Sequence, residues 1–234
     1  MFDLSLAFST ALTLITSGDP ALLGIVRLSL LISLSAVLIA AVIGLPLGAF
    51  LALSRFPGRG GMLIVLNALM GLPPVVVGLA LYVLLSRSGP LGAWGLLFSP
   101  AAMVMAQAVL VIPIIAALGR QAVADLWEEY GEQLRSLGAS RGRVMLTLLW
   151  DGRFSLITVL LAGFGRAAAE VGAVMVVGGN IKEVTRTMTT AIALETSKGD
   201  LPLALGLGII LLGVVTMINA AAVLAGAWAR KAAG

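Results

Sequence analysis

Four stretches of this chain are long enough to cross a lipid bilayer and contain no charged residue. They are residues 28–54, 62–86, 88–119 and 201–229. A hydrocarbon core of about 30 Å needs about 20 helical residues, so each stretch is predicted to contain a transmembrane helix. The third stretch carries Gly and Pro in its first half, which places its helix at about residues 101–118.

A fifth stretch, residues 154–177, is equally apolar except for Arg166 and Glu170. Charges at this depth are costly and usually face a protein interior or a water-filled cavity. The fold class predicted is therefore an all-α integral membrane protein with five spans, at about residues 28–54, 62–86, 101–118, 154–177 and 201–229.

Composition agrees with this class and excludes several kinds of chemistry. Of the 234 residues, 60% are hydrophobic and 11% charged, whereas soluble domains carry roughly 25% charged residues. The chain has no Cys and no His, which excludes thiolate nucleophiles, imidazole bases and Cys/His metal sites. The net charge of +4 is interpreted as an excess of basic residues on the cytoplasmic side of a membrane. No nucleic-acid partner is predicted.

The basic residues predict the orientation. Nine lie on one side of the five predicted spans, and five lie on the other side together with five acidic residues. The side with nine should be cytoplasmic, which puts the N-terminus outside and residues 230–234 in a cytoplasmic tail. Residues 1–21 are predicted to form an external interfacial segment, because residues 4–17 are too short to span and begin beside Asp3. A tilted sixth helix remains the alternative.

The long polar segment, residues 120–153, separates the third and fourth predicted spans. Apolar residues recur there at helical spacing from Leu126 to Leu137, and Asp125 is placed to cap the helix start. Gly138 can adopt the left-handed conformation that ends a helix, and Ser140 can cap a second helix. The segment is predicted to be a cytoplasmic helix, sharp turn and helix; a hairpin that only packs on the bundle is the alternative.

The run from Glu132 to Ser140, E-Q-L-R-S-L-G-A-S, resembles the E-A-A-x-x-x-G loop of permease subunits of bacterial ABC importers. In that family the loop is the coupling helix, which docks in a groove of the cytoplasmic ATPase. The resemblance implies ATPase coupling for seven residues, although Gln133-Leu134 replaces the usual Ala-Ala pair. They are Glu132, Leu134, Arg135, Leu137, Gly138, Ala139 and Ser140.

Three further runs resemble the molybdate and tungstate branch of these permeases: residues 71–78, 88–92 and 165–173. Residues 178–181 do so as well, and residues 187–200 are most similar to tungstate permeases. The resemblance implies a type I, molybdate-permease-like transmembrane domain over residues 22–229. It also implies a homodimer in the bacterial inner membrane, coupled to ABC ATPase subunits and supplied by an extracytoplasmic tungstate-binding protein.

Two features of the predicted spans are candidates for the translocation pathway or its gate. Pro73 and Pro74 remove amide donors in mid-span and should kink the second span. Arg166 and Glu170 are four residues apart and should pair, either as a structural ion pair or as a source of positive potential for an anion. The runs that carry the resemblance add Gly172 and Asn180 to these candidates.

ATP hydrolysis should belong to another chain. This sequence has no Gly-Lys dipeptide, so it cannot form a G-x-x-x-x-G-K-[ST] phosphate loop. The chain is therefore predicted to be a transporter subunit and not an enzyme, with no cofactor of its own and with ATP and Mg²⁺ bound by the partner. Tungstate import by alternating access is the predicted function. A molybdate or sulfate permease is the alternative within the class, and an uncoupled channel or membrane scaffold is the alternative outside it.

Overall fold

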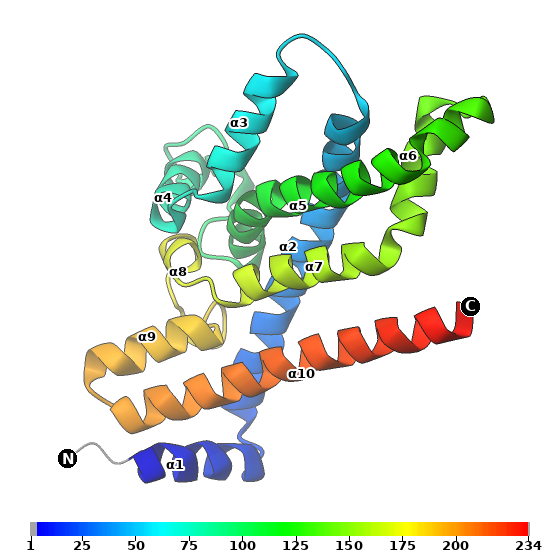
Figure 1. The fold of residues 1–234 in the computed structure, drawn as a ribbon. Coiled ribbons are helices and arrows are strands. Elements are labelled where there is room, and N and C mark those ends of the chain that lie inside the picture. The colour runs from blue at the N-terminus through cyan, green and yellow to red at the C-terminus, as the bar shows by residue number, and fades with distance from the viewer. Residues whose placement is uncertain (1–3, 234) are drawn as a thin grey trace.

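A computed structural model describes the backbone of residues 4–233, and it describes side chains from residue 8 to residue 228 (Figure 1). This described part contains α-helices and one short 3-10 helix. In chain order the elements are α1 (Leu4–Thr16), α2 (Pro20–Leu53), α3 (Arg59–Met70), α4 (Pro74–Leu85), η1 (Gly92–Trp94), α5 (Pro100–Ser136), α6 (Arg141–Asp151), α7 (Arg153–Ala168), α8 (Gly172–Gly178), α9 (Met188–Lys198) and α10 (Leu201–Ala233).

Three of the described helices are individually long and apolar enough to cross a membrane: α2, α5 and α10. Two more spans result if each bent pair of helices counts as one, namely α3 with α4 and α6 with α7. The all-helical membrane architecture predicted from the sequence is confirmed at this level. The prediction of five spans remains one way to count them.

Two of the five spans are not the continuous helices that the sequence predicted. The stretch 62–86 is divided into α3 and α4, which meet at 97°, a right-angle turn where only a kink was expected. The stretch 154–177 is divided into α7 and α8, because α7 ends at Ala168 and α8 begins at Gly172. The division leaves Glu170 between two helices, where it was expected inside one.

The third span and the first helix of the polar segment are one helix. α5 runs from Pro100 to Ser136 without interruption, so the separate helix start predicted at Asp125 is wrong. Asp125 lies within α5, where its carboxylate accepts a hydrogen bond from the Gln121 side chain at 2.7 Å. The apolar residues after Asp125 do lie at helical spacing, as predicted. They belong, however, to the same helix as the third span.

The close packing of α2 on α5 forms the centre of the structure (Figure 1). Gly44 and Gly48 of α2 face the α5 backbone, and small residues at such a contact let two helices approach closely. A Cβ atom on Gly48 would lie 2.8 Å from the Arg120 amide nitrogen, and one on Gly44 would lie 3.1 Å from the Ile112 carbonyl oxygen. The distance at Gly48 leaves no room for a Cβ atom, so the contact requires glycine there, and the distance at Gly44 is shorter than ordinary van der Waals contact.

The first helix of the chain packs along the last one. α1 packs against α10, and a cluster around Ala11, Leu22, Leu207 and Ile210 fills the contact with α2 (Figure 1). At 13 residues α1 is shorter than a span requires. The backbone of the predicted cytoplasmic tail, residues 230–234, continues α10 as far as Ala233, whereas its side chains and Gly234 lie outside the described residues.

The α2–α5 contact predicts the effect of adding a single methyl group. Gly48→Ala should lower the stability of the detergent-solubilised protein by about 1–3 kcal/mol, because backbone atoms of α5 must move. Gly24→Ala is the matched control on the same helix, since a Cβ atom there meets nothing within 4 Å. Thermal unfolding should show a lower melting temperature for Gly48→Ala alone, and equal melting temperatures would contradict this account of the contact.

Candidate coupling and pathway sites

The end of α5 and the start of α6 form a hairpin with a sharp turn at Gly138. Gly138 has φ of +65°, the left-handed conformation that the sequence analysis predicted. Its amide donates to the Arg135 carbonyl oxygen at 2.9 Å, and the Ala139 amide donates to the Leu134 carbonyl oxygen at 3.2 Å. These two bonds form a Schellman motif, which satisfies the last carbonyls of α5 and fixes the direction of the chain.

Ser140 occupies the N-cap position of α6, as predicted, but its side chain makes no capping hydrogen bond with the described residues. The α6 helix starts on a backbone bond instead, from the Val144 amide to the Ser140 carbonyl oxygen at 2.9 Å. The hydroxyl of Ser140 is exposed. Ser140 therefore contributes an extended backbone conformation to the helix start and no side-chain hydrogen bond.

One face of the hairpin is buried against the end of α2. Ala49 of α2 and Val123, Val144 and Leu148 of the hairpin are each at most 5% exposed, and Leu134 packs against them. Val144 and Leu148, four residues apart on α6, form its buried apolar stripe. This contact packs the end of α2 against both α5 and α6.

The opposite face of the hairpin carries three exposed apolar side chains. Leu137 is 80% exposed, Trp150 69% and Leu146 66%. Glu132 and Arg135 are also exposed on this segment. The structure places the side chain of Leu137, one of the predicted coupling residues, at the tip of the hairpin beside Gly138. Exposed apolar side chains next to charged ones are typical of a surface that binds another protein.

Arginine and tyrosine side chains on the hairpin have defined neighbours. The Arg135 guanidinium lies 4.9 Å from the centre of the Trp127 ring, a cation–π contact that holds Arg135 along α5. A side-chain hydrogen bond with Glu129, together with the negative charge of that carboxylate, raises the pKa of Tyr130. The Tyr130 hydroxyl therefore stays protonated throughout the physiological pH range.

The broken spans meet each other. α4 begins at Pro74, directly after Pro73, and α8 packs against it. A Cβ atom on Gly172 would lie 2.9 Å from the Val75 side chain, and one on Gly78 would lie 2.9 Å from the Ala173 Cα atom. The structure thus brings together three pathway candidates that are far apart in the sequence: Pro73, Pro74 and Gly172. Glu170 lies beside them, two residues before Gly172.

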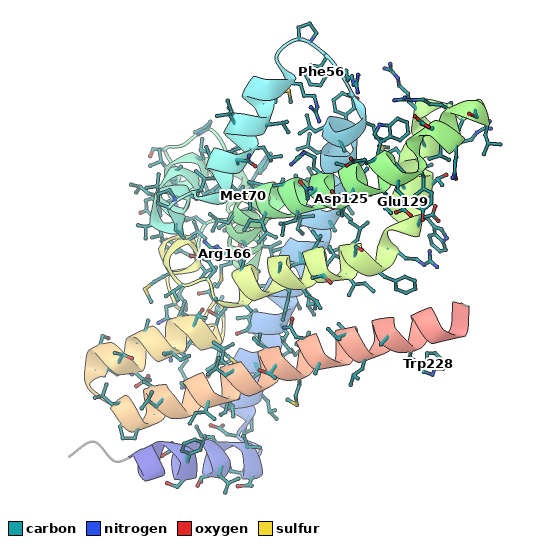
Figure 2. The ribbon with its side chains drawn as sticks, viewed as in Figure 1. Phe56, Met70, Asp125, Glu129, Arg166 and Trp228 are labelled. Atoms are coloured by element: carbon teal, nitrogen blue, oxygen red, sulfur yellow. The ribbon has the colours of Figure 1, made fainter. Side chains whose placement is uncertain are left out.

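Arg166 and Glu170 form the predicted ion pair. The Arg166 Nη1 atom lies 2.6 Å from the Glu170 Oε2 atom, and the side chains are 30% and 3% exposed. The second carboxylate oxygen, Oε1, accepts the Ala173 amide at 2.9 Å. Figure 2 shows Arg166 near the end of α7, next to α8. Because Glu170 lies in the gap between these helices, its carboxylate supports the start of α8 as well as pairing with Arg166.

Polar side chains of α5 and α9 complete this junction. The Thr189 hydroxyl donates to the Glu170 carbonyl oxygen at 2.8 Å, and the Gln107 amide donates to the Ala167 carbonyl oxygen at 3.0 Å. Gln107 is 3% exposed, and its Oε1 atom has no hydrogen-bond partner among the described residues. A small cavity lies beside Gln107 and is also lined by Ser29, Ser33 and Thr189.

Asn180 lies apart from the ion pair, in the turn that follows α8. Its φ of 49° is left-handed, and its side-chain amide donates to the Thr190 carbonyl oxygen at 3.4 Å. The Asn180 carbonyl oxygen accepts from Arg186 at 3.5 Å. The Asn180 side chain thereby connects the turn after α8 to α9. Of the six pathway candidates, it is the one that the structure does not place at the α4–α8 contact or in the adjoining ion pair.

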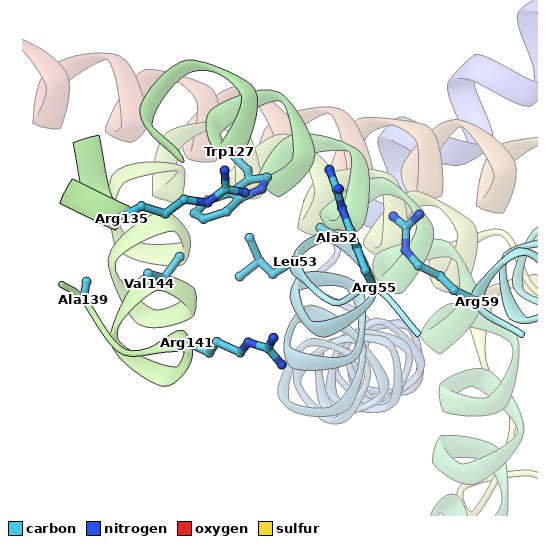
Figure 3. A pocket seen from close by; sticks show the side chains of 9 residues that line it. All are labelled: Ala52, Leu53, Arg55, Arg59, Trp127, Arg135, Ala139, Arg141 and Val144. Atoms are coloured by element: carbon cyan, nitrogen blue, oxygen red, sulfur yellow. The ribbon is translucent and has the colours of Figure 1, made fainter. Parts of the chain in front are cut away.

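Members of the two sets of basic residues line cavities at opposite ends of α2. Arg55, Arg59, Arg135 and Arg141 line one cavity, next to Ala52 and Leu53 at the end of the helix (Figure 3). Arg27, Lys182 and Arg186 line another, next to Pro20 and Ala21 at its start. A helix of 34 residues is about 50 Å long, longer than the hydrocarbon core. Residues that the sequence assigned to the same side of the membrane are thus grouped together.

Curated relatives match this chain over most of its length. The tungstate uptake system permease protein TupB of Peptoclostridium acidaminophilum is 41% identical over 213 residues, which cover 91% of this chain and 93% of the relative. TupB of Campylobacter jejuni is 36% identical over 91% of this chain and 89% of the relative. A probable anion ABC transporter permease of Haloferax volcanii is 38% identical over 85% of this chain and 88% of the relative.

The chain belongs to the family of ABC transporter permeases that includes these tungstate uptake proteins. No family model matches the chain. Permeases named for sulfate and molybdenum transport match at 30–33% identity. The resemblance stated from the sequence is confirmed, and the chain is a multi-pass membrane subunit of the permease kind.

Sequence reasoning missed Gln107, Thr189 and Ser29 in this permease. Gln107 is the one polar residue between positions 101 and 118, and a lone amide in a span is a usable signal because it needs a partner there. Thr189 gave no such signal, because it stands among several other threonines in a polar stretch of the sequence. Its contact with the Glu170 backbone depends on how α9 folds back, which local sequence does not specify.

The ion pair of the permease predicts an asymmetric mutational effect. Arg166→Gln leaves a buried carboxylate without its cation, whereas Glu170→Gln leaves a partly exposed arginine that water can reach. We expect Arg166→Gln to cost more stability, at the lower end of about 3–5 kcal/mol, and the double variant to cost less than the sum of the two. Thermal unfolding in detergent measures all three variants.

The control for this cycle is the exposed pair of Lys182 and Glu183, whose nitrogen and oxygen lie 3.8 Å apart. Lys182→Gln should change stability by about 0–1 kcal/mol. Strictly additive effects of the Arg166 and Glu170 substitutions would show that the pair carries no coupling energy and would contradict its structural role.

Proposed function

We propose that this chain is the membrane permease of a tungstate importer. The observation that carries the proposal is the match to two tungstate uptake permeases at 36–41% identity over 91% of the chain. The weaker readings are a permease for molybdate or sulfate and, in a different class, an uncoupled channel or scaffold. The match to ABC transporter permeases disfavours an uncoupled channel, because such permeases act with other subunits.

The proposed transporter is a homodimer of this chain with two cytoplasmic ABC ATPase subunits and an extracytoplasmic tungstate-binding protein. The ATPase subunits bind ATP and Mg²⁺, and this chain supplies the path across the membrane. The hairpin at Gly138 is the proposed contact with the ATPase. Its exposed apolar side chains, Leu137, Leu146 and Trp150, support this assignment because a groove in a partner would bury them.

In the proposed cycle, ATP closes the ATPase pair and the two hairpins move with it. α5 is one continuous helix from the hairpin to Pro100, so displacement at Ser136 reaches Gln107 near the other end. Gln107 contacts the Ala167 carbonyl at the end of α7, next to the Arg166–Glu170 pair. Movement of the hairpin can therefore change the α4–α8 contact, where Pro73, Pro74 and Gly172 form the proposed gate.

We place discrimination between oxyanions outside this chain. Tungstate and molybdate are both doubly charged tetrahedral anions of nearly equal size, so a path that must release its cargo has little basis for separating them. A tight site on the binding protein can do so before docking. Along the path, the hydroxyl and amide groups near Gln107 and the partly exposed Arg166 are the donors that an anion would meet.

Uptake by the reconstituted complex tests the function and the coupling together. Proteoliposomes that contain the permease, its ATPase and a tungstate-binding protein should accumulate tungstate when ATP is supplied. Gly138→Val should abolish ATP-driven uptake while the protein still inserts, because a β-branched residue is strained at φ of +65°. Gly142→Val is the matched control, because Gly142 lies inside α6 and a Cβ atom there has nothing within 4 Å.

The same assay separates the alternatives. Replacing the tungstate-binding protein by a docking molybdate-binding protein should change the anion that accumulates, and an unchanged preference would place selectivity in this chain. Accumulation without ATP or ATPase would identify an uncoupled channel. Normal uptake and normal ATPase stimulation in Gly138→Val would contradict the coupling role of the hairpin.

The proposed orientation has the N-terminus outside, and the hairpin and the C-terminus in the cytoplasm. The chain has no native cysteine, and two exposed serines form a matched pair for labelling. Ser136 and Ser197 each donate to a backbone carbonyl within their own helix. A membrane-impermeant thiol reagent should label Ser197→Cys on intact cells and Ser136→Cys only after permeabilisation, and the reverse pattern would invert the topology.

A further inference from the structure

A cavity of about 410 Å³ lies between the end of α2 and the hairpin (Figure 3). Arg135 and Arg141 reach it from the hairpin side, and Arg55 and Arg59 from the connection between α2 and α3. The remaining lining residues are Ala52, Leu53, Trp127, Ala139 and Val144. Four positive charges therefore surround one space, and none of the residues that line it is acidic.

The arginines around this cavity lack a counter-charge within the described part of the chain. No ion pair there includes Arg55, Arg59, Arg135 or Arg141. Two of them are fixed by other contacts: the Arg59 Nε atom donates to the Leu51 carbonyl oxygen at 2.8 Å, and Arg135 lies over Trp127. Arrangement of like charges around a cavity is unfavourable unless an anion occupies it.

We propose that this cavity binds a phosphate-type tetrahedral oxyanion. The guanidinium group presents a planar set of N–H donors that matches phosphate oxygens two at a time, and Arg is favoured at such sites for that reason. The cavity lies at the end of the apolar helix α2, where basic pockets between transmembrane helices bind anionic lipid headgroups. The anion has two sources with the same chemistry: a phospholipid headgroup, or a free oxyanion such as phosphate or tungstate.

The cavity does not include the exposed apolar side chains of the hairpin. Leu137, Leu146 and Trp150 do not line it, whereas Arg135 and Ala139, two of the predicted coupling residues, do. A bound anion would connect Arg55 and Arg59, at the junction of α2 and α3, to Arg135 and Arg141 on the hairpin. It would thereby stiffen the link between the coupling hairpin and the first two predicted spans.

Trp127 provides a local reporter, because it lines the cavity and contacts Arg135. In full-length protein with Trp94, Trp150 and Trp228 replaced by Phe, Trp127 is the sole tryptophan. The protein is placed in phosphatidylcholine nanodiscs and titrated with inorganic phosphate and with tungstate at constant ionic strength. A parallel sample contains phosphatidylglycerol in the nanodisc, and native mass spectrometry counts the lipids retained per chain.

We expect a saturable change in Trp127 fluorescence. In the double variant Arg55→Gln/Arg141→Gln the apparent Kd should be at least about tenfold weaker, or the retained phosphatidylglycerol should be lost. Arg120→Gln/Arg143→Gln removes the same charge from arginines that do not line the cavity and should behave as the parent. Arg141→Lys keeps the charge without the planar fork and should give an intermediate response, which guards against a folding defect in the double variant.

Each outcome has one meaning. A response to phosphate or tungstate in phosphatidylcholine identifies a free oxyanion as the ligand, and a response confined to phosphatidylglycerol nanodiscs identifies a lipid headgroup. An absent response, or one that is equal in the cavity and control variants, would overturn the proposal. So would a change that requires the ATPase and no added anion, because the cavity would then belong to the protein interface.

Discussion

The Glu170 carboxylate makes the interrupted part of this membrane protein possible. A helix that stops within the bilayer exposes backbone groups that lipid cannot satisfy, and Glu170 lies where α7 has ended and α8 has not begun. One carboxylate oxygen accepts the Ala173 amide and the other pairs with Arg166. The backbone carbonyl of Glu170 accepts from Thr189. One residue therefore joins α7, α8 and α9, and the close contact of α8 with α4 depends on that junction.

α5 relates this junction to the hairpin at the other end of the molecule. It is continuous from Pro100 to Ser136 and contacts the junction through Gln107. The α2 helix lies against it at Gly44 and Gly48, too closely for the two helices to slide without breaking backbone packing. In the proposed transport cycle, α2, α5 and the hairpin consequently move as one body. The short helices α4 and α8 belong to a separate apolar cluster, in which Val77, Leu81 and Val174 are buried against the start of α5.

Local signals predicted some of this structure and could not predict the rest. Gly138 was identified from its position after a helical repeat, and its backbone conformation is a local property. The Arg166–Glu170 pair was likewise predicted from spacing. The end of α7 at Ala168 was not, because residues 154–177 are apolar enough for one helix. The contacts at the break are long-range ones, namely the packing of α8 against α4 and the Thr189 bond to the Glu170 carbonyl oxygen. The helix start predicted at Asp125 was wrong for the opposite reason. A good capping residue does not begin a helix where a longer apolar repeat already continues one.

The distribution of charge along α2 separates the two ends of the permease by chemistry as well as by distance. At one end, Arg27, Lys182 and Arg186 line a cavity that also contains Glu183, so the positive potential there is partly offset. At the other end, four arginines line a cavity that contains no acidic residue. An anion that crosses the proposed path would therefore meet a stronger positive potential on the side of the hairpin. Such a gradient favours inward delivery, but it also retains the anion, and an anion already bound at the four arginines would reduce this retention by screening their charge.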